Sequence, residues 1–277
     1  MNDILVSCVH LQRRFGLFAE EFAERGLRVA LPEVTQQLSE SWLLDNVARF
    51  RGVIAGDDPF TAEVIEKGSN GELEALVKWG IGTDAIDIDA CRRNGVAFAN
   101  TPDVFGNEVA DVACGYIIML ARQLHRVHES VLAGGWEKPI GMSLSGKSLG
   151  IIGLGSIGRA IAIRGDSFGM RVLGADIVSP DFDLPSVEMC TFDEVLRRAD
   201  VLVLACNLTK DNHHLIDEET IGRMKEGAFL VNVARGPLVR EEDLVQALRD
   251  GGLAGAALDV FEEEPLPTDS ELRQIES

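Results

Sequence analysis

Short apolar runs alternate with amphipathic stretches along the first hundred residues. A helical pattern over Leu17–Arg25 ends at Gly26, and Pro32 interrupts an apolar run soon afterwards. The runs that have the length of strands are Ile4–Val9, Leu27–Leu31, Gly52–Ala55 and Leu73–Trp79. Strands that are separated by helical stretches predict a parallel sheet. We therefore expect a small α/β domain over residues 1–102.

A long amphipathic helix is predicted after this domain. Apolar side chains recur at helical spacing from Val109 to Val131, and Gly134 and Gly135 follow as a stop signal. The apolar stripe is compatible with a helix packed on its own domain and with a dimer interface. The pattern alone leaves both interpretations open.

The second half of the chain predicts another α/β domain, over residues 103–277 with the long helix at its start. The expected strands are Leu149–Gly153, Arg171–Ala175, Val201–Ala205, Phe229–Asn232 and Ala254–Leu258. The expected helices are Ile157–Phe168, Ile221–Lys225 and Glu241–Arg249. These strands are apolar almost throughout, as in a sheet that helices cover on both faces.

Charge and cysteine content exclude several function classes. The formal charge of −19 disfavours binding to nucleic acid or to anionic membrane surfaces. The five cysteines form no C-x-x-C pair, so a disulfide framework or a zinc site is not expected. The apolar run Ile4–Val9 is too short for a signal peptide, and the helix near Ala110–Leu124 contains Asp111 and Arg122. We expect a cytoplasmic protein without a metal or a membrane span.

A glycine-rich turn carries the first chemical signal. Gly153, Gly155 and Gly158 form a G-x-G-x-x-G motif that follows a predicted strand and opens a predicted helix. The first glycine permits the tight turn, the second lets a pyrophosphate approach the backbone, and the third lets helix and strand pack closely. The motif predicts a Rossmann-type dinucleotide-binding domain.

An acidic residue stands where the ribose of the cofactor is expected. Asp176 ends the second strand of this domain, eighteen residues after Gly158. A carboxylate there accepts hydrogen bonds from the ribose hydroxyls and repels a 2′-phosphate. The sequence therefore predicts NAD rather than NADP.

From about Gly52 to Pro265 the sequence resembles the D-isomer-specific 2-hydroxyacid dehydrogenases, especially their phosphoglycerate dehydrogenase branch. Besides the glycine motif, the resemblance rests on Gly80–Asp84, Asn100–Pro102, Gly146–Gly150, Asn232–Gly236, Gly255–Phe261 and the pair Glu264-Pro265. It implies an NAD-dependent oxidoreductase with a flavodoxin-like α/β substrate domain in front of the Rossmann-type domain. It also implies an active site in the cleft between the two domains, and a homodimer.

The resemblance assigns two catalytic residues. Arg235 matches the arginine that binds the carboxylate and the carbonyl oxygen of the substrate, a task that suits a planar, permanently charged guanidinium. Glu264 matches the acid that orients a catalytic histidine. The cofactor contacts that it implies are Ile81, Gly153, Gly155, Ser156, Ile157, Gly158, Asp176, Cys206, Val233, Ala234 and Asp259.

The sequence departs from the family's pattern near its end. In the family a histidine in a Pro-His pair follows the glutamate and serves as general acid and base, but no histidine occurs among residues 265–277. In the family the chain continues past this histidine and crosses back to complete the substrate domain. That return segment is missing as well. We expect that the sequence is truncated, and that the chain as printed turns over poorly. A catalytically impaired or inactive NAD-binding homologue is the alternative.

A second departure concerns the substrate. The phosphoglycerate branch carries a basic residue near the stretch after its third strand, whereas this chain reads Ala55-Gly56-Asp57-Asp58-Pro59. Acidic side chains there would repel a phosphate group, so 3-phosphoglycerate is disfavoured. We expect another D-2-hydroxy acid or 2-keto acid as substrate. A related hydride-transfer enzyme for a different anion is a further alternative.

Overall fold

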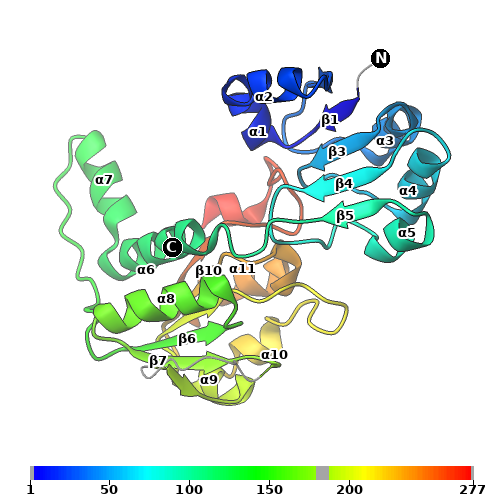
Figure 1. Cartoon of the computed structure of the whole chain (residues 1–277). Coiled ribbons are helices and arrows are strands. Elements are labelled where there is room, and N and C mark those ends of the chain that lie inside the picture. The colour runs from blue at the N-terminus through cyan, green and yellow to red at the C-terminus, as the bar shows by residue number, and fades with distance from the viewer. Residues whose placement is uncertain (1–2, 179–186, 276–277) are drawn as a thin grey trace. The chain divides into compact units, whose positions relative to one another are not determined.

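The computed structural model describes residues 3–178 and 187–275. The chain divides into two compact units, Met1–Val104 and Phe105–Ser277 (Figure 1). Each unit has its own parallel sheet and its own hydrophobic core.

The sheet of the first unit has the strand order β2-β1-β3-β4-β5, and its pairs are parallel. The strands are β1 (Ile4–Val6), β2 (Val29–Ala30), β3 (Gly52–Ala55), β4 (Ala75–Lys78) and β5 (Ala97–Ala99). This 2-1-3-4-5 order is that of flavodoxin-like folds. The flavodoxin-like α/β prediction is confirmed.

The helices of the first unit are α1 (Val9–Arg14), α2 (Ala19–Glu24), α3 (Glu40–Asn46), α4 (Ala62–Ser69) and α5 (Ile88–Arg93). Three of them begin at a polar side chain that accepts a backbone N–H of the first turn: Ser39, Thr61 and Asp87. They bury Leu43, Ile65 and Ala90 against the sheet. This packing supplies the core that holds the carboxyl ends of the strands in place.

The N-terminal prediction was wrong in two details. The first strand ends at Val6 instead of Val9, because Val9 begins α1, which buries Leu11. The helix predicted over Leu17–Arg25 is a 3₁₀ turn, Phe15–Leu17, followed by α2. Its predicted end at Gly26 is confirmed, since that glycine has φ +69°.

The sheet of the second unit has the strand order β11-β10-β9-β6-β7-β8, and its pairs are parallel. The strands are β6 (Ser148–Ile152), β7 (Arg171–Ala175), β8 (Val187–Met189), β9 (Val201–Leu204), β10 (Ala228–Asn232) and β11 (Leu253–Leu258). Counted from β6, this is the doubly wound order of Rossmann-type domains. Every residue of β6 and of β9 is buried, as their continuous apolar runs predict.

The second unit has six described α-helices, namely α6 (Gly106–Arg122), α7 (Leu124–Leu132), α8 (Ser156–Ser167), α9 (Phe192–Arg198), α10 (Glu218–Ile221) and α11 (Glu241–Arg249). All of them except α7 contribute residues to two core clusters. The helix predicted over Ile221–Lys225 lies earlier, because Asp217 caps α10 by accepting the Thr220 N–H. In the described part of the chain, every helix is too short or too polar to cross a membrane.

The long helix predicted from Val109 to Val131 is two helices. Gln123 lies between α6 and α7 with φ +52°, a left-handed conformation that ends α6. α6 buries Ala113, Ile117 and Leu120 in the core of the second unit. α7 has no buried residue, and Leu132 is 75% exposed. The apolar side chains of α6 therefore pack in the core of the second unit, whereas none of those on α7 is buried.

Candidate functional site

The three glycines of the turn after β6 each have a structural reason. Gly153 has φ +93°, and a Cβ on it would lie 2.6 Å from Cα of Cys206. A Cβ on Gly158 would overlap the carbonyl oxygen of Gly153. A Cβ on Gly155 would meet no described atom within 4 Å. The turn is therefore closed toward the protein at Gly153 and Gly158 and open at Gly155.

The glycine turn leads directly into α8. Gly155 is the N-cap, and Ser156, Ile157 and Gly158 form the first turn. The first intrahelical bond is the one from Arg159 N to the Gly155 carbonyl, at 3.0 Å. The N–H groups before it are those that bind anions at helix N-termini. The open face at Gly155 and this helix end together fit a pyrophosphate.

Asp176, the residue after β7, is tied to the same turn. Its Oδ2 accepts the Leu154 N–H at 2.6 Å, and its Oδ1 accepts the Val178 N–H at 3.0 Å. A carboxylate has about four lone-pair positions, so two remain for hydroxyl donors. Asp176 is exposed. It therefore both braces the turn and offers free acceptor capacity to a ribose.

The strands β9 and β10 place further residues that were predicted to contact the cofactor at the same edge of the sheet. Cys206 follows β9, and burial raises the pKa of its thiol to about 11, so the thiol is neutral at physiological pH. Val233 and Ala234 follow β10 and are both buried. Because parallel strands end at one edge, these residues join the glycine turn and Asp176 at the carboxyl edge of the sheet.

Arg235 is positioned by a buried amide. Oδ1 of Asn232, the last residue of β10, accepts the Ala234 N–H at 3.0 Å, and its Nδ2 donates to the Arg235 carbonyl at 2.9 Å. The Arg235 guanidinium also donates to the Ala234 carbonyl at 2.7 Å. Sequence reasoning assigned no role to Asn232, although a fully buried polar residue at a strand end is itself a signal.

Asp259 and Glu264 lie on the segment that follows β11. The hydroxyl of Tyr116, on α6, donates to Oδ1 of Asp259 at 2.9 Å. Oε1 of Glu264 accepts the Phe261 N–H at 2.9 Å. A Cβ on Gly236 would overlap the Phe261 carbonyl, so the turn that carries Arg235 packs against the segment that carries Glu264.

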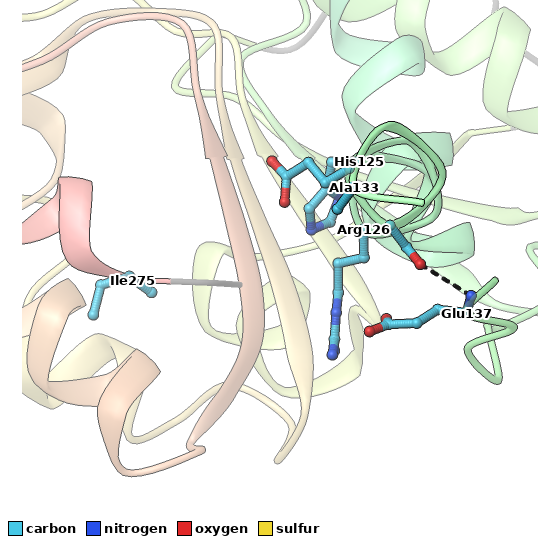
Figure 2. Close-up of a pocket in the computed structure, with 7 residues that line it drawn as sticks. His125, Arg126, Ala133, Glu137 and Ile275 are labelled. Carbon is cyan, nitrogen blue, oxygen red and sulfur yellow. Dashed lines mark hydrogen bonds between the residues drawn. The ribbon is translucent and has the colours of Figure 1, made fainter. Parts of the chain in front are cut away.

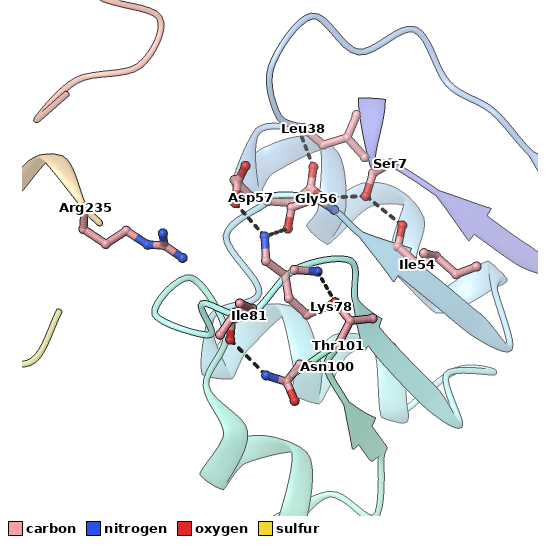
Figure 3. Close-up of polar contacts among 12 residues, drawn as sticks. Ser7, Leu38, Ile54, Gly56, Asp57, Lys78, Ile81, Asn100, Thr101 and Arg235 are labelled. Carbon is pink, nitrogen blue, oxygen red and sulfur yellow. Dashed lines mark hydrogen bonds and ion pairs between the residues drawn. The ribbon is translucent and has the colours of Figure 1, made fainter. Parts of the chain in front are cut away.

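Ile81 belongs to the first unit, in the loop after β4 (Figure 3). Its carbonyl accepts Nδ2 of Asn100 at 2.9 Å, and the Gly80 N–H donates to Oγ1 of Thr101 at 3.0 Å. Gly80 has φ +152°, which favours glycine. Two sequence blocks that carry the resemblance thus meet in space and hold this loop.

The acidic stretch after β3 is held by contacts inside the first unit (Figure 3). Asp58 is fully buried and accepts the Ser7 hydroxyl at 2.5 Å, the Leu38 N–H at 2.7 Å and the Gly56 N–H at 2.9 Å. Nζ of Lys78, which is 4% exposed, lies 2.5 Å from Oδ1 of Asp57. Lys78 therefore offsets one of the two negative charges, which weakens the repulsion of a phosphate expected from the sequence. Lys78 was not identified from the sequence as the compensating charge.

A separate cavity of about 520 Å³ lies beside α7 (Figure 2). Its lining includes Arg126, Glu129 and Glu137, and the Glu137 N–H donates to Oγ of Ser130 at 3.0 Å. Among the described residues, the buried Nδ1 of His125 has no hydrogen-bond partner. The described lining residues include none of the predicted site residues.

Sequence comparison connects this arrangement to known proteins. The model of the D-isomer specific 2-hydroxyacid dehydrogenase NAD binding domain matches residues 114–277. A glyoxylate reductase from Thermofilum pendens is 37% identical over 229 residues, which are 79% of this chain and 67% of that protein. A hydroxypyruvate reductase from Thermotoga maritima is 38% identical over 225 residues, which are 80% of this chain and 72% of that protein.

Solved structures are also similar to this chain over nearly its whole length. D-lactate dehydrogenase from Aquifex aeolicus, complexed with NAD and lactic acid, is 28% identical with a TM-score of 0.85. The match covers 99% of this chain and 84% of that one. The TT0316 protein from Thermus thermophilus is 32% identical with a TM-score of 0.86, over 99% of this chain and 86% of that one.

Proposed function

The chain belongs to the D-isomer-specific 2-hydroxyacid dehydrogenase family, and we propose that Arg235 and Glu264 carry its chemistry at the carboxyl edge of the second sheet. The protein is an NAD-dependent oxidoreductase that interconverts a D-2-hydroxy acid and its 2-keto acid. One observation carries the assignment of residues: the glycine turn, Asp176, Arg235 and Asp259 all follow strands of one parallel sheet. The comparisons give no support to an inactive homologue.

The glycine turn and α8 hold the cofactor. Ser156, Ile157 and Gly158 present backbone N–H groups to the pyrophosphate, while Gly155 leaves room for it. The free acceptor positions of Asp176 bind the ribose hydroxyls, and its charge disfavours a 2′-phosphate. Cys206, Val233, Ala234 and Asp259 complete the contacts from the second unit, and the cofactor contact of Ile81 stays a prediction from the resemblance. The bound nicotinamide supplies or accepts the hydride.

Arg235 binds the substrate. Its guanidinium pairs with the carboxylate through parallel hydrogen bonds and stabilises negative charge on the C2 oxygen. Asn232 fixes the turn from which it projects. In the family the corresponding glutamate orients the histidine of the Pro-His pair, which is the general acid and base that moves the hydroxyl proton. Residues 265–277 contain no histidine, so Glu264 supplies only the orienting carboxylate, while Arg235 acts on the charge of the substrate.

The substrate is a small 2-keto acid of the glyoxylate or hydroxypyruvate kind. The names of the two relatives described above support this choice. The test is reduction of glyoxylate, hydroxypyruvate, pyruvate and 3-phosphohydroxypyruvate by NADH, followed at 340 nm. Turnover of glyoxylate or hydroxypyruvate with the highest kcat/KM supports the proposal. A clear preference for the phosphorylated acid would reject it.

We also propose that the protein is a homodimer that pairs through α7 and the segment after it. This part of the chain exposes large apolar side chains, namely Leu124, Val131, Leu132, Trp136 and Ile140. Clustered exposed apolar residues are typical of protein–protein contacts. The cytoplasmic location expected from the sequence stays a prediction.

A further inference from the structure

His214 has a backbone conformation that its side-chain contacts must hold. Its φ of +54° lies in the left-handed region, which few non-glycine residues adopt. Its backbone N–H donates to the Pro237 carbonyl at 2.8 Å. Its side chain, 23% exposed, lies between Glu262 and Arg240. A residue with a strained backbone keeps that conformation only where the surrounding structure fixes it. The contacts of the His214 side chain therefore stabilise an otherwise unfavourable backbone conformation.

The partners of the imidazole fix its protonation and tautomer. Nε of Arg240 lies 3.2 Å from Nδ1 of His214, and a guanidinium nitrogen can only donate. Nδ1 is therefore the acceptor, and Nε2 carries the proton. Nε2 lies 2.6 Å from Oε1 of Glu262 and donates to it. The neutral ring thus links a cation on one side with an anion on the other.

Glu262 is held on its other side by the start of α11. Its Oε2 accepts the Glu241 N–H at 3.2 Å, and its own N–H donates to Oε1 of Glu241 at 2.7 Å. Burial raises the pKa of Glu241, and the nearby charge of Glu262 adds to the rise. His214 and Glu241 therefore clamp Glu262 through both its side chain and its backbone.

The clamped residue lies between the two parts of the proposed site. Phe261, directly before Glu262, donates its N–H to Glu264, and its carbonyl packs against Gly236 beside Arg235. We propose that His214 is a positioning residue, which through Glu262 fixes the Phe261–Glu264 segment and with it the placement of Glu264 and Arg235. This inference rests on the proposed function of those two residues.

The test uses glycine and glutamine at this position. His214→Gly removes the clamp but suits the left-handed backbone, so the loop is not strained by the change. In His214→Gln the amide oxygen accepts from Arg240 and the amide nitrogen donates to Glu262, as the neutral imidazole does. His213→Gly is the matched control, because His213 is the exposed neighbour whose ring centroid lies 3.9 Å from that of His214.

Hydrogen exchange of backbone amides, read by mass spectrometry, gives a readout that does not depend on turnover. We expect faster exchange in the peptide that covers residues 259–264 of His214→Gly, with unchanged exchange over β6 and α8. His214→Gln and His213→Gly should exchange as the wild type does. Equal exchange of residues 259–264 in His214→Gly and wild type would overturn the proposal. A uniform rise over the whole second unit would overturn it too, since the role would then be general stability.

Kinetics test the link to the site. In His214→Gly, kcat/KM for the keto acid should fall by up to about 100-fold, the loss that a misplacement of about 1 Å causes. The NAD dissociation constant should not change. A His214→Gly/Glu262→Ala double variant should lose no more than the worse single variant, because both changes remove the same contact between His214 and Glu262. Additive losses would contradict the clamp. If the wild type itself reduces no keto acid, the proposed function fails, and hydrogen exchange still decides about His214.

Discussion

The hydroxyl of Tyr116 on α6 lies 2.9 Å from Oδ1 of Asp259, the first residue after β11. The two residues are 143 positions apart in the sequence. The bond joins the helix that leads into the second unit to a residue proposed to contact the cofactor. Tyr116 thereby restrains Asp259 in the free protein, so less ordering remains to be done when the cofactor binds.

Tyr116→Phe should weaken NAD binding without preventing it. The change removes one hydrogen bond, worth about 0.5–1.5 kcal/mol, which corresponds to roughly two- to tenfold in affinity. Isothermal titration with NAD measures the change. Unaltered affinity in Tyr116→Phe would show that Asp259 needs no such restraint.

The same tyrosine predicts a loss of stability at high pH. Burial, and then the hydrogen bond to Asp259, raise the pKa of Tyr116 to about 12, against about 10 for an unfolded tyrosine. Because the folded state keeps the proton longer, this contribution to stability is complete below pH 10 and is lost as the pH rises through 12. Tyr116 is the sole tyrosine of the chain, so absorbance at 295 nm reports its titration alone. A midpoint near 10 in the folded protein would contradict this prediction.

Asp176→Asn should reduce the preference for NAD over NADP. The amide oxygen still accepts the Leu154 N–H, so the glycine turn keeps its brace, while the charge that repels a 2′-phosphate is gone. A gain of about 1.4 kcal/mol for NADP corresponds to roughly tenfold in the ratio of the two dissociation constants. Titration with both cofactors measures this ratio. Tighter binding of NADP than NAD by the wild type would reject the assignment of Asp176.

Arg235→Lys and Arg235→Gln should separate charge from geometry. Loss of a group that stabilises developing charge costs about 10²–10³ in rate. Lysine keeps the charge without the two parallel donors, so Arg235→Lys should fall between the wild type and Arg235→Gln. Binding of oxamate, an unreactive keto-acid analogue, to the NADH-loaded protein should weaken in the same order. Equal oxamate binding in all three proteins would remove Arg235 from the substrate site.

Negative charges introduced on α7 by substitution should dissociate the proposed dimer. The wild type should sediment at twice 30.1 kDa, and Val131→Glu/Leu132→Glu should sediment at 30.1 kDa. A glutamate on exposed Leu17 in the first unit is the matched control and should leave the dimer intact. A wild type that is monomeric at micromolar concentration would disprove pairing through this surface.

Asp58→Asn should destabilise the first unit. The carboxylate accepts three hydrogen bonds in a fully buried position, and the amide must turn a donor toward at least one of these donors. A cost of roughly 2–3 kcal/mol in the free energy of unfolding is expected. Urea unfolding followed by tryptophan fluorescence measures this free energy. Asp45→Asn, at an exposed position of α3, is the control. A loss no greater than that of the control would show that Asp58 is not needed as an anion.

Regular elements with a clear hydrophobic period were predictable from the sequence. The bounds of β3, β7 and α11 match the predicted Gly52–Ala55, Arg171–Ala175 and Glu241–Arg249. The break at Gln123 was not predictable, because neither glycine nor proline marks it and the apolar spacing continues across it. The strand β5 was not predicted, although residues 96–99 form a short apolar run; its own residues are exposed or half-buried.

The residues of the candidate site also fall into predicted and missed ones. Residues with a motif, such as the three glycines and Asp176, were predicted and do lie at one edge of one sheet. Tyr116 and His214 were not predicted as supports, because their hydrogen-bond partners are distant in sequence and leave no local pattern. Lys78 was missed for the same reason: its partner Asp57 lies 21 residues before it, on another strand connection. Asn232 was missed although its partners, Ala234 and Arg235, are close to it in sequence.

The strands of the first sheet all lie between Ile4 and Ala99, with no contribution from the described strands of the second unit. During synthesis the ribosome therefore releases the whole set of these strands before any residue of β6 has been made. Domains generally fold as units, with the N-terminal one first. The strands of the first sheet can thus pair while the glycine turn is still being translated. Unpaired strand edges of the first sheet are then no longer available to the strands of the second sheet.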